Sequence, residues 1–284
     1  MAISDLQAVF LHPCFMDSGN SCRNDGDVAC VDTYGVLVKI QPCSFDDMST
    51  FRFQQFSVIQ RQSAMKVCTD AVLFGAMAPV NRGDRVLDIG AGTGVLSLMA
   101  AQLGAAQVTA VELTQQGYEE AHINFNNSPW ADRLEAVHLD IQGFASTAGC
   151  QYDLIICNPP FFENHSKTTN SLRKIARHND QLPFDDLIKS ADELLSSQGL
   201  FYLLLPVHAV EKFAAAALAA GFYLIHRTDF RGYTHNEAKV SALTFSRTVA
   251  VFAASLLTVY ESHRVYTKDS ERYLSPFLLR FSKH

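Results

Sequence analysis

Short apolar runs alternate with stretches of helical periodicity from Arg85 to Ala220, and this alternation limits the chain to few architectures. The strand-like runs are Arg85–Ile89, Gln107–Leu113, Leu134–Asp140, Tyr152–Cys157, Leu200–Leu205, Phe222–Arg231, Val240–Ser246 and Ser255–Tyr260. The helix-like stretches are Val95–Leu103, Gln115–Asn127, Asp185–Ser196 and His208–Ala220. Because no helix separates the last three strands, we expect an α/β fold whose mostly parallel sheet has antiparallel C-terminal strands and helices on both faces.

The composition is that of a folded chain, with 284 residues of which 48% are hydrophobic and 18% charged. This length allows one or two domains and a large core that needs no disulfide or metal. The formal net charge of −6 disfavours a bulk polyelectrolyte binder, although it allows a local basic patch.

No segment resembles a targeting signal or a membrane span. Residues 1–15 have no Lys or Arg ahead of their weak apolar stretch, so we expect no secretory signal. The longest apolar run, 213–225, is shorter than the roughly 20 residues that a membrane span needs. The seven cysteines are odd in number and none has C-x-x-C spacing. We therefore expect a cytoplasmic protein with reduced thiols, no metal and no membrane contact.

The first 47 residues differ from the rest of the chain. They hold four of the seven cysteines and two clusters of turn-forming residues, and only Val36–Ile40 resembles a strand. Two interpretations are open: a small cysteine-bearing domain, or a poorly ordered extension that arises from a start codon assigned too early. We favour the second, with Met48 as the natural start and residues 48–284 as the folded domain.

A glycine-rich loop joins the first strand of the alternating region to its helix, with the sequence Asp88-Ile89-Gly90-Ala91-Gly92-Thr93-Gly94. Glycines let a ligand approach the backbone, and the helix start offers unpaired N–H groups. The spacing is neither G-x-G-x-x-G nor that of a phosphate-binding loop. Because Asp88 would repel a pyrophosphate but accept a hydrogen bond from an ammonium group, the loop favours a nucleoside that carries an amino acid.

Two further acids stand at the ends of the next two predicted strands. Glu112 can accept hydrogen bonds from both hydroxyls of a ribose, and Asp140 with Ile141 can hold an adenine amino group. Because the carboxyl ends of parallel strands meet at one edge of a sheet, we expect Asp88, Glu112 and Asp140 to line one crevice.

The fourth predicted strand ends in the tetrapeptide Asn158-Pro159-Pro160-Phe161, which is the most informative feature of the chain. The prolines fix the backbone, so that the Asn158 amide and the Pro159 carbonyl are held as two acceptors. Two converging acceptors suit an amino group on a flat ring, and Phe161 offers that ring a stacking face. Hydrogen bonds to both acceptors would draw the amine lone pair out of conjugation and direct it at an electrophile.

These motifs together resemble the S-adenosylmethionine-dependent amino-methyltransferases of the Rossmann-like class. Further segments are similar to the tRNA1(Val) (adenine-37-N6)-methyltransferase family over residues 48–284; these are Phe51–Phe56, Met65–Ala71, Ser128–Trp130, Arg173–His178 and Tyr266–Phe281. The resemblance implies a seven-stranded Rossmann-like methyltransferase fold, S-adenosyl-L-methionine as cofactor, and the adenine beside the anticodon of a tRNA as substrate. We expect the enzyme to act as a monomer.

The resemblance also implies roles for individual residues. The cofactor contacts fall on Asp88, Gly90, Gly92, Glu112 and Asp140, and the catalytic residues are Asn158, Pro159, Pro160 and Phe161. Lys66 and Thr69 would lie beside the methionine end of the cofactor. The family usually has Gly-Thr-Asp-Gly where this chain has Cys68-Thr69-Asp70-Ala71, so a loop that needed φ > 0 at those glycines would be placed differently here.

Methyl transfer from a sulfonium is expected to be a direct in-line displacement without a metal, in which the protein mainly positions the reactants. Phosphate contacts must come from local positive charge. Residues 163–178 include Lys167, Arg173, Lys174 and Arg177 against Glu163 alone, and we expect these cations to contact the anticodon loop. For a second basic run, 264–284, RNA contact and an ordinary solvated surface are equally good interpretations.

Two other interpretations remain. A protein-glutamine or ribosomal-RNA guanine methyltransferase would use a similar tetrapeptide, although the former would need an N-terminal helical substrate-binding domain that residues 1–47 do not provide. A non-enzymatic RNA-binding protein with a vestigial cofactor fold is disfavoured, because the loop and the tetrapeptide are both intact.

Overall fold

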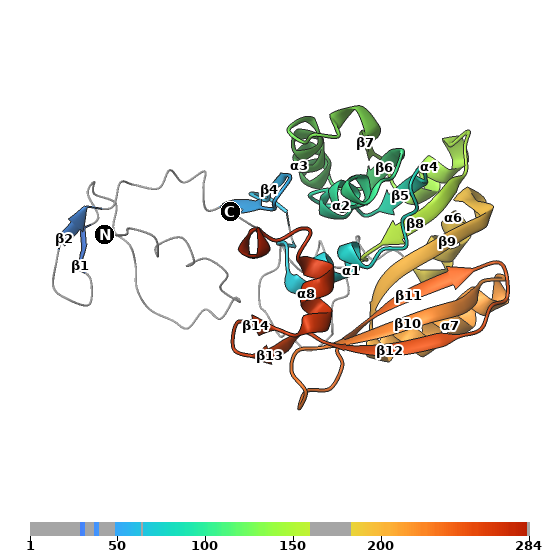
Figure 1. Cartoon of the computed structure of the whole chain (residues 1–284). Helices are drawn as coiled ribbons and strands as arrows, with labels where there is room; N and C mark the ends of the chain where they lie inside the picture. Colours follow the sequence, from blue (N-terminus) through green and yellow to red (C-terminus); the bar gives the residue numbers. More distant parts are fainter. Residues whose placement is uncertain (1–28, 32–36, 40–48, 64, 160–182, 283–284) are drawn as a thin grey trace, which may run out of the picture. The chain divides into compact units, whose positions relative to one another are not determined.

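The computed structural model describes residues 29–31, 37–39, 49–63, 65–159 and 183–282 (Figure 1). The chain divides into two compact units, Met1–Thr50 and Phe51–His284. In the first unit β1 (Ala29–Val31) pairs antiparallel with β2 (Leu37–Lys39). The predictions of a poorly ordered extension and of a start at Met48 concern mostly residues outside the described ranges, so they stay predictions.

An eight-stranded sheet forms the centre of the second unit, in the order β12-β10-β11-β9-β8-β5-β6-β7. The strands are β5 (Arg85–Ile89), β6 (Gln107–Glu112), β7 (Leu134–His138), β8 (Tyr152–Cys157), β9 (Leu195–Pro206), β10 (Tyr223–Arg231), β11 (Val240–Ser246) and β12 (Ala253–Thr258). All eight strand-like runs predicted between Arg85 and Tyr260 contribute to this sheet. β8 is buried throughout its centre, since Leu154, Ile155 and Ile156 are all inaccessible to solvent.

Helices cover both faces of this sheet, as predicted. One hydrophobic core lies under α1 (Thr69–Ala76), α2 (Val95–Leu103), α3 (Gln115–Asn126) and α8 (Lys268–Leu274). A second core on the opposite face lies under α4 (Ile141–Thr147), α6 (Phe184–Leu194) and α7 (Val210–Ala219). The α/β fold with a mostly parallel sheet is therefore confirmed.

Two details of the predicted sheet were wrong. The sheet has eight strands, not the seven that the resemblance implies, because β12 adds an edge strand parallel to β10. Among the three late strands only β11 is antiparallel to the rest. The chain crosses from β9 to β10 through α7, so β10 runs parallel to β9. β11 then lies between β9 and β10 and is antiparallel to both.

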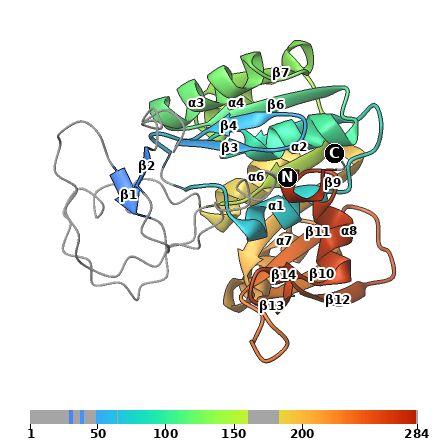
Figure 2. The same ribbon diagram turned by 60° about the vertical axis from the view of Figure 1, so that its left-hand side comes forward.

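A small hairpin, β3 (Thr50–Arg52) with β4 (Ser57–Ile59), precedes α1 and lies along α3 (Figure 2). The buried Asn124 of α3 fixes it, since its amide accepts from Ile59 N at 2.8 Å and donates to Ile59 O at 3.0 Å. The same amide donates to Thr93 O in the glycine loop at 2.9 Å. The Asn124 side chain thus connects the β3–β4 hairpin, α3 and the glycine loop through hydrogen bonds.

The remaining elements lie near the end of the chain. The hairpin β13 (Tyr260–Ser262) and β14 (Val265–Tyr266) precedes α8, and a short 3-10 helix, η4 (Leu279–Phe281), follows it. No helix in the described part of the chain has the length and apolar character needed to cross a bilayer.

Candidate active site

The strand registers bring the predicted site residues to one edge of the sheet. Ile89 at the end of β5 pairs with Cys157 of β8 and with Val111 of β6. Glu112, which ends β6, pairs with His138 of β7. Asn158, Gly90, Glu112 and Asp140 therefore follow one another across four neighbouring parallel strands, at the carboxyl edge where open α/β sheets bind ligands.

The three glycines of the loop all have positive φ, at +72° for Gly90, +53° for Gly92 and +77° for Gly94. A Cβ added at Gly90 or Gly92 would meet no atom within 4 Å, whereas one at Gly94 would lie 2.4 Å from the Phe125 ring. Gly94 is thus needed for packing against α3. Gly90 and Gly92 border open space, which a side chain at either position would fill, and this is the shape of a ligand cradle.

Glu112 is buried, with 8% of its surface exposed, and its carboxylate lies beside the glycine loop. One oxygen accepts from Gly92 N at 2.8 Å, and the other accepts from Thr114 N at 2.9 Å and from Thr114 Oγ1 at 2.7 Å. A carboxylate has about four lone-pair sites, so a free acceptor position remains beside these three donors. The predicted ribose contact at Glu112 is compatible with this arrangement and stays a prediction.

Asp88 is completely buried beneath the loop. Its Oδ2 accepts from Ser97 Oγ at 2.7 Å, while its Oδ1 has no hydrogen-bond partner among the described residues. Burial raises the pKa of this carboxyl to about 7, the hydrogen bond from Ser97 opposes the shift, and the charge of Glu112 adds to it. An unsatisfied buried carboxylate oxygen calls for a donor. An ammonium group in the cradle would supply one, so these residues fit a cofactor with an amino-acid moiety.

Three further residues predicted to contact the cofactor, Asp140, Lys66 and Thr69, form hydrogen bonds with other groups of the protein. Asp140 is exposed and caps α4, its Oδ1 accepting from Gly143 N at 2.6 Å. Lys66 is exposed and donates to the carbonyls of Gln60 and Arg61, while Thr69 Oγ1 lies 3.1 Å from the Tyr260 hydroxyl. The roles of Asp140, Lys66 and Thr69 toward a cofactor therefore stay predictions.

The departure from the family pattern before α1 carries no strain. Cys68 caps α1 with φ −128°, and Ala71 lies within the helix. Neither position needs the left-handed conformation that favours glycine, so a cysteine and an alanine fit without a change in backbone.

Asn158 emerges from β8 half-buried, and Pro159 is buried. Among the described residues, none forms a hydrogen bond with the Asn158 amide. Cys157, directly before it, is fully buried, and burial followed by the charge of Asp88 raises the pKa of its thiol, which keeps it a thiol and not a nucleophile. Pro160, Phe161, Lys167, Arg173, Lys174 and Arg177 lie outside the described residues.

Two site-supporting residues were not found from the sequence. Glu120 accepts from Gln62 N at 2.6 Å and from Ser63, and Asn124 holds the glycine loop as described above. Both lie on the buried stripe of α3 with Ala121 and Phe125. Polar residues at the apolar positions of an amphipathic helix are the signal that could have found them.

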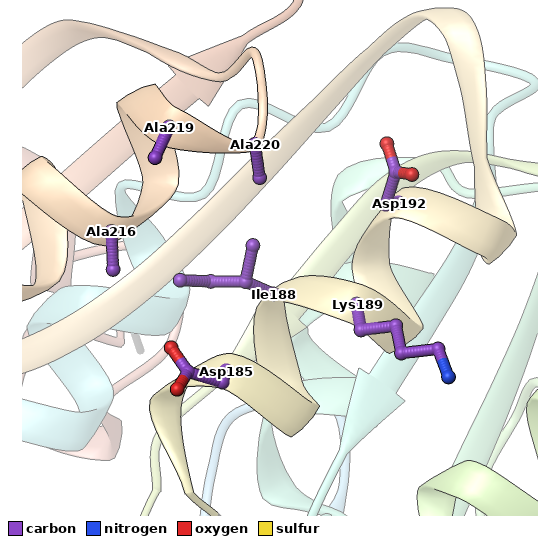
Figure 3. A pocket seen from close by; sticks show the side chains of 7 residues that line it. All are labelled: Asp185, Ile188, Lys189, Asp192, Ala216, Ala219 and Ala220. Atoms are coloured by element: carbon purple, nitrogen blue, oxygen red, sulfur yellow. The ribbon is translucent and has the colours of Figure 1, made fainter.

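A surface hollow lies between α6 and α7 (Figure 3), lined by Asp185, Ile188, Lys189, Asp192, Ala216, Ala219 and Ala220. It contains no predicted site residue, and its alanines and solvated charges offer no convergent set of donors. Within the described residues, no group of three or more His, Cys, Asp or Glu side chains could hold a metal ion.

Comparisons with known proteins define the class first. Residues 63–212 match the family model "Methyltransferase small domain", so the chain is a methyltransferase of the Rossmann-like class. A predicted O-methyltransferase from Agrobacterium tumefaciens has the same fold, with a TM-score of 0.57 and 22% identity over 72% of this chain and 94% of that one. A methyltransferase complexed with SAH also shares it, with a TM-score of 0.52 and 18% identity over 75% of this chain and 59% of that one.

The family follows from a closer relative. The tRNA1(Val) (adenine(37)-N6)-methyltransferase of Flavobacterium psychrophilum is 43% identical over 221 residues, which are 77% of this chain and 94% of the relative. The chain belongs to the tRNA1(Val) (adenine(37)-N6)-methyltransferase family.

Proposed function

We propose that this enzyme transfers a methyl group from S-adenosyl-L-methionine to the exocyclic N6 of an adenine in tRNA, and that its substrate is adenine 37 of tRNA1(Val). The observation that carries this proposal is the placement of Asn158. Asn158 follows β8 directly beside Gly90, where the open cradle lies, and its amide has no hydrogen-bond partner among the described residues. The curated relatives support the substrate, since they are named for this reaction.

The cofactor supplies an already activated methyl group on a sulfonium. Asp88 and Glu112 would hold its amino-acid and ribose ends, with Gly90 and Gly92 allowing close approach and Asp140 at the far side of the crevice. Lys66 and Thr69 remain proposed contacts of the methionine end. Because no acid–base step is needed to activate the donor, the chain's task is to bind and orient the target amine.

Asn158 and the Pro159 carbonyl would accept hydrogen bonds from the target amino group and direct its lone pair toward the methyl group. Pro160 would keep the tetrapeptide rigid, and Phe161 would stack on the adenine ring. The target base must leave its neighbours to reach this edge, and in the unpaired anticodon loop that cost is small. Lys167, Arg173, Lys174 and Arg177 are proposed to hold phosphates of that loop.

The remaining parts of the proposal concern the whole chain. We propose a cytoplasmic monomer whose catalytic unit is residues 48–284, with residues 1–47 as a dispensable extension. Cys68, Cys150 and Cys157 are free thiols, which fits a reducing compartment. Light scattering of the purified protein would measure the oligomeric state, and a chain that lacks residues 1–47 should keep its fold and activity.

The direct test is methylation with tritiated cofactor, offered total tRNA and total protein in parallel. Label is expected in tRNA, and nucleoside mass spectrometry should identify N6-methyladenosine, which disappears from tRNA1(Val) in a strain that lacks this protein. Label in protein would support a glutamine methyltransferase, and N2-methylguanosine in ribosomal RNA would support the guanine enzyme. RNA binding without any incorporated label would support a non-enzymatic RNA-binding protein.

A further inference from the structure

Five aromatic rings form a continuous series at the surface, which we call the aromatic ladder: His235, Tyr233, Tyr260, Tyr266 and Phe281. Their consecutive ring centroids are 5.6, 5.6, 5.0 and 6.0 Å apart. The outer pair, His235 and Tyr233, is nearly parallel, with 5° between the ring planes. These rings come from the β10–β11 connection, the β13–β14 hairpin and η4, so the fold and not local sequence assembles them.

Within the ladder, burial falls from Tyr266 toward His235. Tyr266 is 8% exposed and packs in the main core, Tyr233 and Tyr260 are half-buried, and His235 is exposed. Core packing therefore accounts for the inner rings but not for the outer pair. An exposed stack of flat rings is what proteins use to hold unpaired nucleic-acid bases, since every base has a π-face.

The outer pair is held in place before any ligand arrives. Tyr233 N donates to the Asn236 side chain at 2.9 Å, and Asn236 N donates back to Tyr233 O at 2.9 Å. The hairpin is tied to the same connection, because Tyr260 N donates to Gly232 O at 2.8 Å. A fixed platform loses little conformational entropy when it binds a ring.

The ladder stands at the same edge of the sheet as Asn158. β10 runs parallel to β9, so its connection to β11 leaves the carboxyl edge, and Figure 1 shows β13 and β14 beside that end of β10 and β11. Val240 pairs with Pro206, and Leu203 pairs with Cys157. Two strand spacings and two residues along the strand place Val240, the first residue after the β10–β11 connection, roughly 12 Å from Asn158.

Cations flank the ladder. Arg280 lies 4.9 Å from the Tyr266 ring and donates to Arg264 O at 3.2 Å. Lys239 and Arg264 are both exposed; Lys239 ends the β10–β11 connection that holds Tyr233, and Arg264 lies in the turn between β13 and β14. Positive side chains beside exposed rings complement a sugar–phosphate backbone with splayed bases, in a chain whose net charge is −6.

We propose that Tyr233 and His235 stack on unpaired bases of the RNA substrate adjacent to the target adenine, with Lys239 and Arg264 beside the connecting phosphates. This proposal rests on the proposed function, which supplies the RNA. It adds a substrate-positioning surface that is separate from the tetrapeptide and from the basic segment 163–178.

The test compares single variants in the full-length enzyme. Tyr233→Leu and His235→Ala should each weaken binding of an anticodon stem-loop RNA about tenfold and raise its KM, because stacking on one ring contributes roughly that factor. Tyr233→Phe keeps the ring face and should bind as the wild type does. Cofactor affinity should stay unchanged in all three.

Tyr223→Ala is the matched control. Tyr223 opens β10 at the opposite edge of the sheet and is 37% exposed, so its loss removes an exposed tyrosine from the same strand away from the site. It should leave RNA binding unchanged. A stem-loop with 2-aminopurine beside the target adenine gives a direct signal: its fluorescence should be quenched by the wild type and by Tyr223→Ala, and much less by Tyr233→Leu.

The outcomes separate the inference from the proposed function. If the wild type methylates the stem-loop but Tyr233→Leu and His235→Ala behave like Tyr223→Ala, the ladder does not bind RNA and the proposed function stands. If the wild type methylates protein and not RNA, both fail. Should Tyr233→Leu unfold, His235→Ala decides alone, because His235 is exposed and supports no core.

Discussion

The carboxyl edge of the sheet has two halves with different chemistry. The half formed by β5, β6 and β7 presents buried carboxylates and glycines joined by short hydrogen bonds, with Glu112 held by Gly92 and Thr114. The half formed by β8, β9 and the β10–β11 connection presents the Asn158 amide, which has no partner in the described part of the chain, together with flat rings and exposed cations. The first half, with its buried acceptors, suits a small ligand that supplies hydrogen-bond donors. The second half, with its exposed rings and cations, suits a nucleic acid with unpaired bases.

The largest expected effect is a loss of turnover without a loss of cofactor affinity, and it comes from a substitution in the second half. Asn158→Ala should lower kcat by at least about 10²-fold, because the target amine loses the acceptor that orients it. Cofactor affinity should change less than twofold, since Asn158 belongs to the other half. Single-turnover methylation and calorimetry measure the two quantities. Asn126→Ala, at an exposed asparagine of α3, is the control. A near-normal rate in Asn158→Ala would remove the orienting role.

Asp88 is expected to make stability depend on pH within the first half. Because its pKa is about 7 when folded and 3.8 ordinarily, the folded state binds the proton more tightly. The contribution of Asp88 to stability should therefore be fully present below pH 4, decrease by up to about 4 kcal/mol as the pH rises to about 7, and stay constant above that pH. Urea unfolding of the wild type and of Asp88→Asn measures this. Equal slopes in the two proteins between pH 4 and 7 would show that Asp88 does not titrate there.

Two glycines of the same loop should respond differently. Gly94→Ala would place a methyl group against the Phe125 ring at a positive φ, and should lower the free energy of unfolding by about 3 kcal/mol. Gly90→Ala meets no neighbouring atom and should cost only about 1 kcal/mol of backbone strain. It should nevertheless abolish tight cofactor binding, since its methyl group fills the cradle. Thermal unfolding measures the stability of both variants, and calorimetry measures their cofactor affinity. Normal cofactor binding by Gly90→Ala would contradict the prediction.

Much of the first half could be predicted from the sequence, whereas little of the second could. The glycine loop, Glu112 and Asp140 follow strands and precede helices, so local periodicity places them at strand ends. The partners of Asp88 and of the loop could not be predicted, because Ser97 and Asn124 meet them only through packing. The aromatic ladder joins residues from 233 to 281 on three separate elements, which no local pattern indicates. All eight strands of the sheet were predicted from the sequence, but the resemblance implied a seven-stranded sheet, and the direction of β10 and β12 was not predicted.

The two acids of the first half should contribute comparably to cofactor affinity. Asp88→Ala and Glu112→Ala each remove a charge-assisted partner worth roughly 1.5–3 kcal/mol, so Kd should rise about 10- to 150-fold. Glu112→Ala should also loosen the loop, because Gly92 N and Thr114 lose their acceptor. Calorimetry with S-adenosylhomocysteine measures both, and Glu119→Ala on the exposed side of α3 is a suitable control. Unchanged affinity in both acid variants would place the crevice elsewhere.

The smallest expected effect is a weaker binding of tRNA, and it concerns two cations outside the described residues. Charge reversal at Lys174 and Arg177 should raise the KM for tRNA and leave cofactor affinity unchanged, because these cations follow the catalytic tetrapeptide in the chain and would meet the nearest phosphates. Each lost phosphate contact should flatten the dependence of log affinity on log salt by roughly 0.7, the value for single strands. The measurement is tRNA affinity across a salt series for the wild type and the double variant. Parallel lines would mean that these side chains face solvent, and the path of the RNA would then run over the aromatic ladder and the cations at Lys268 and Arg272.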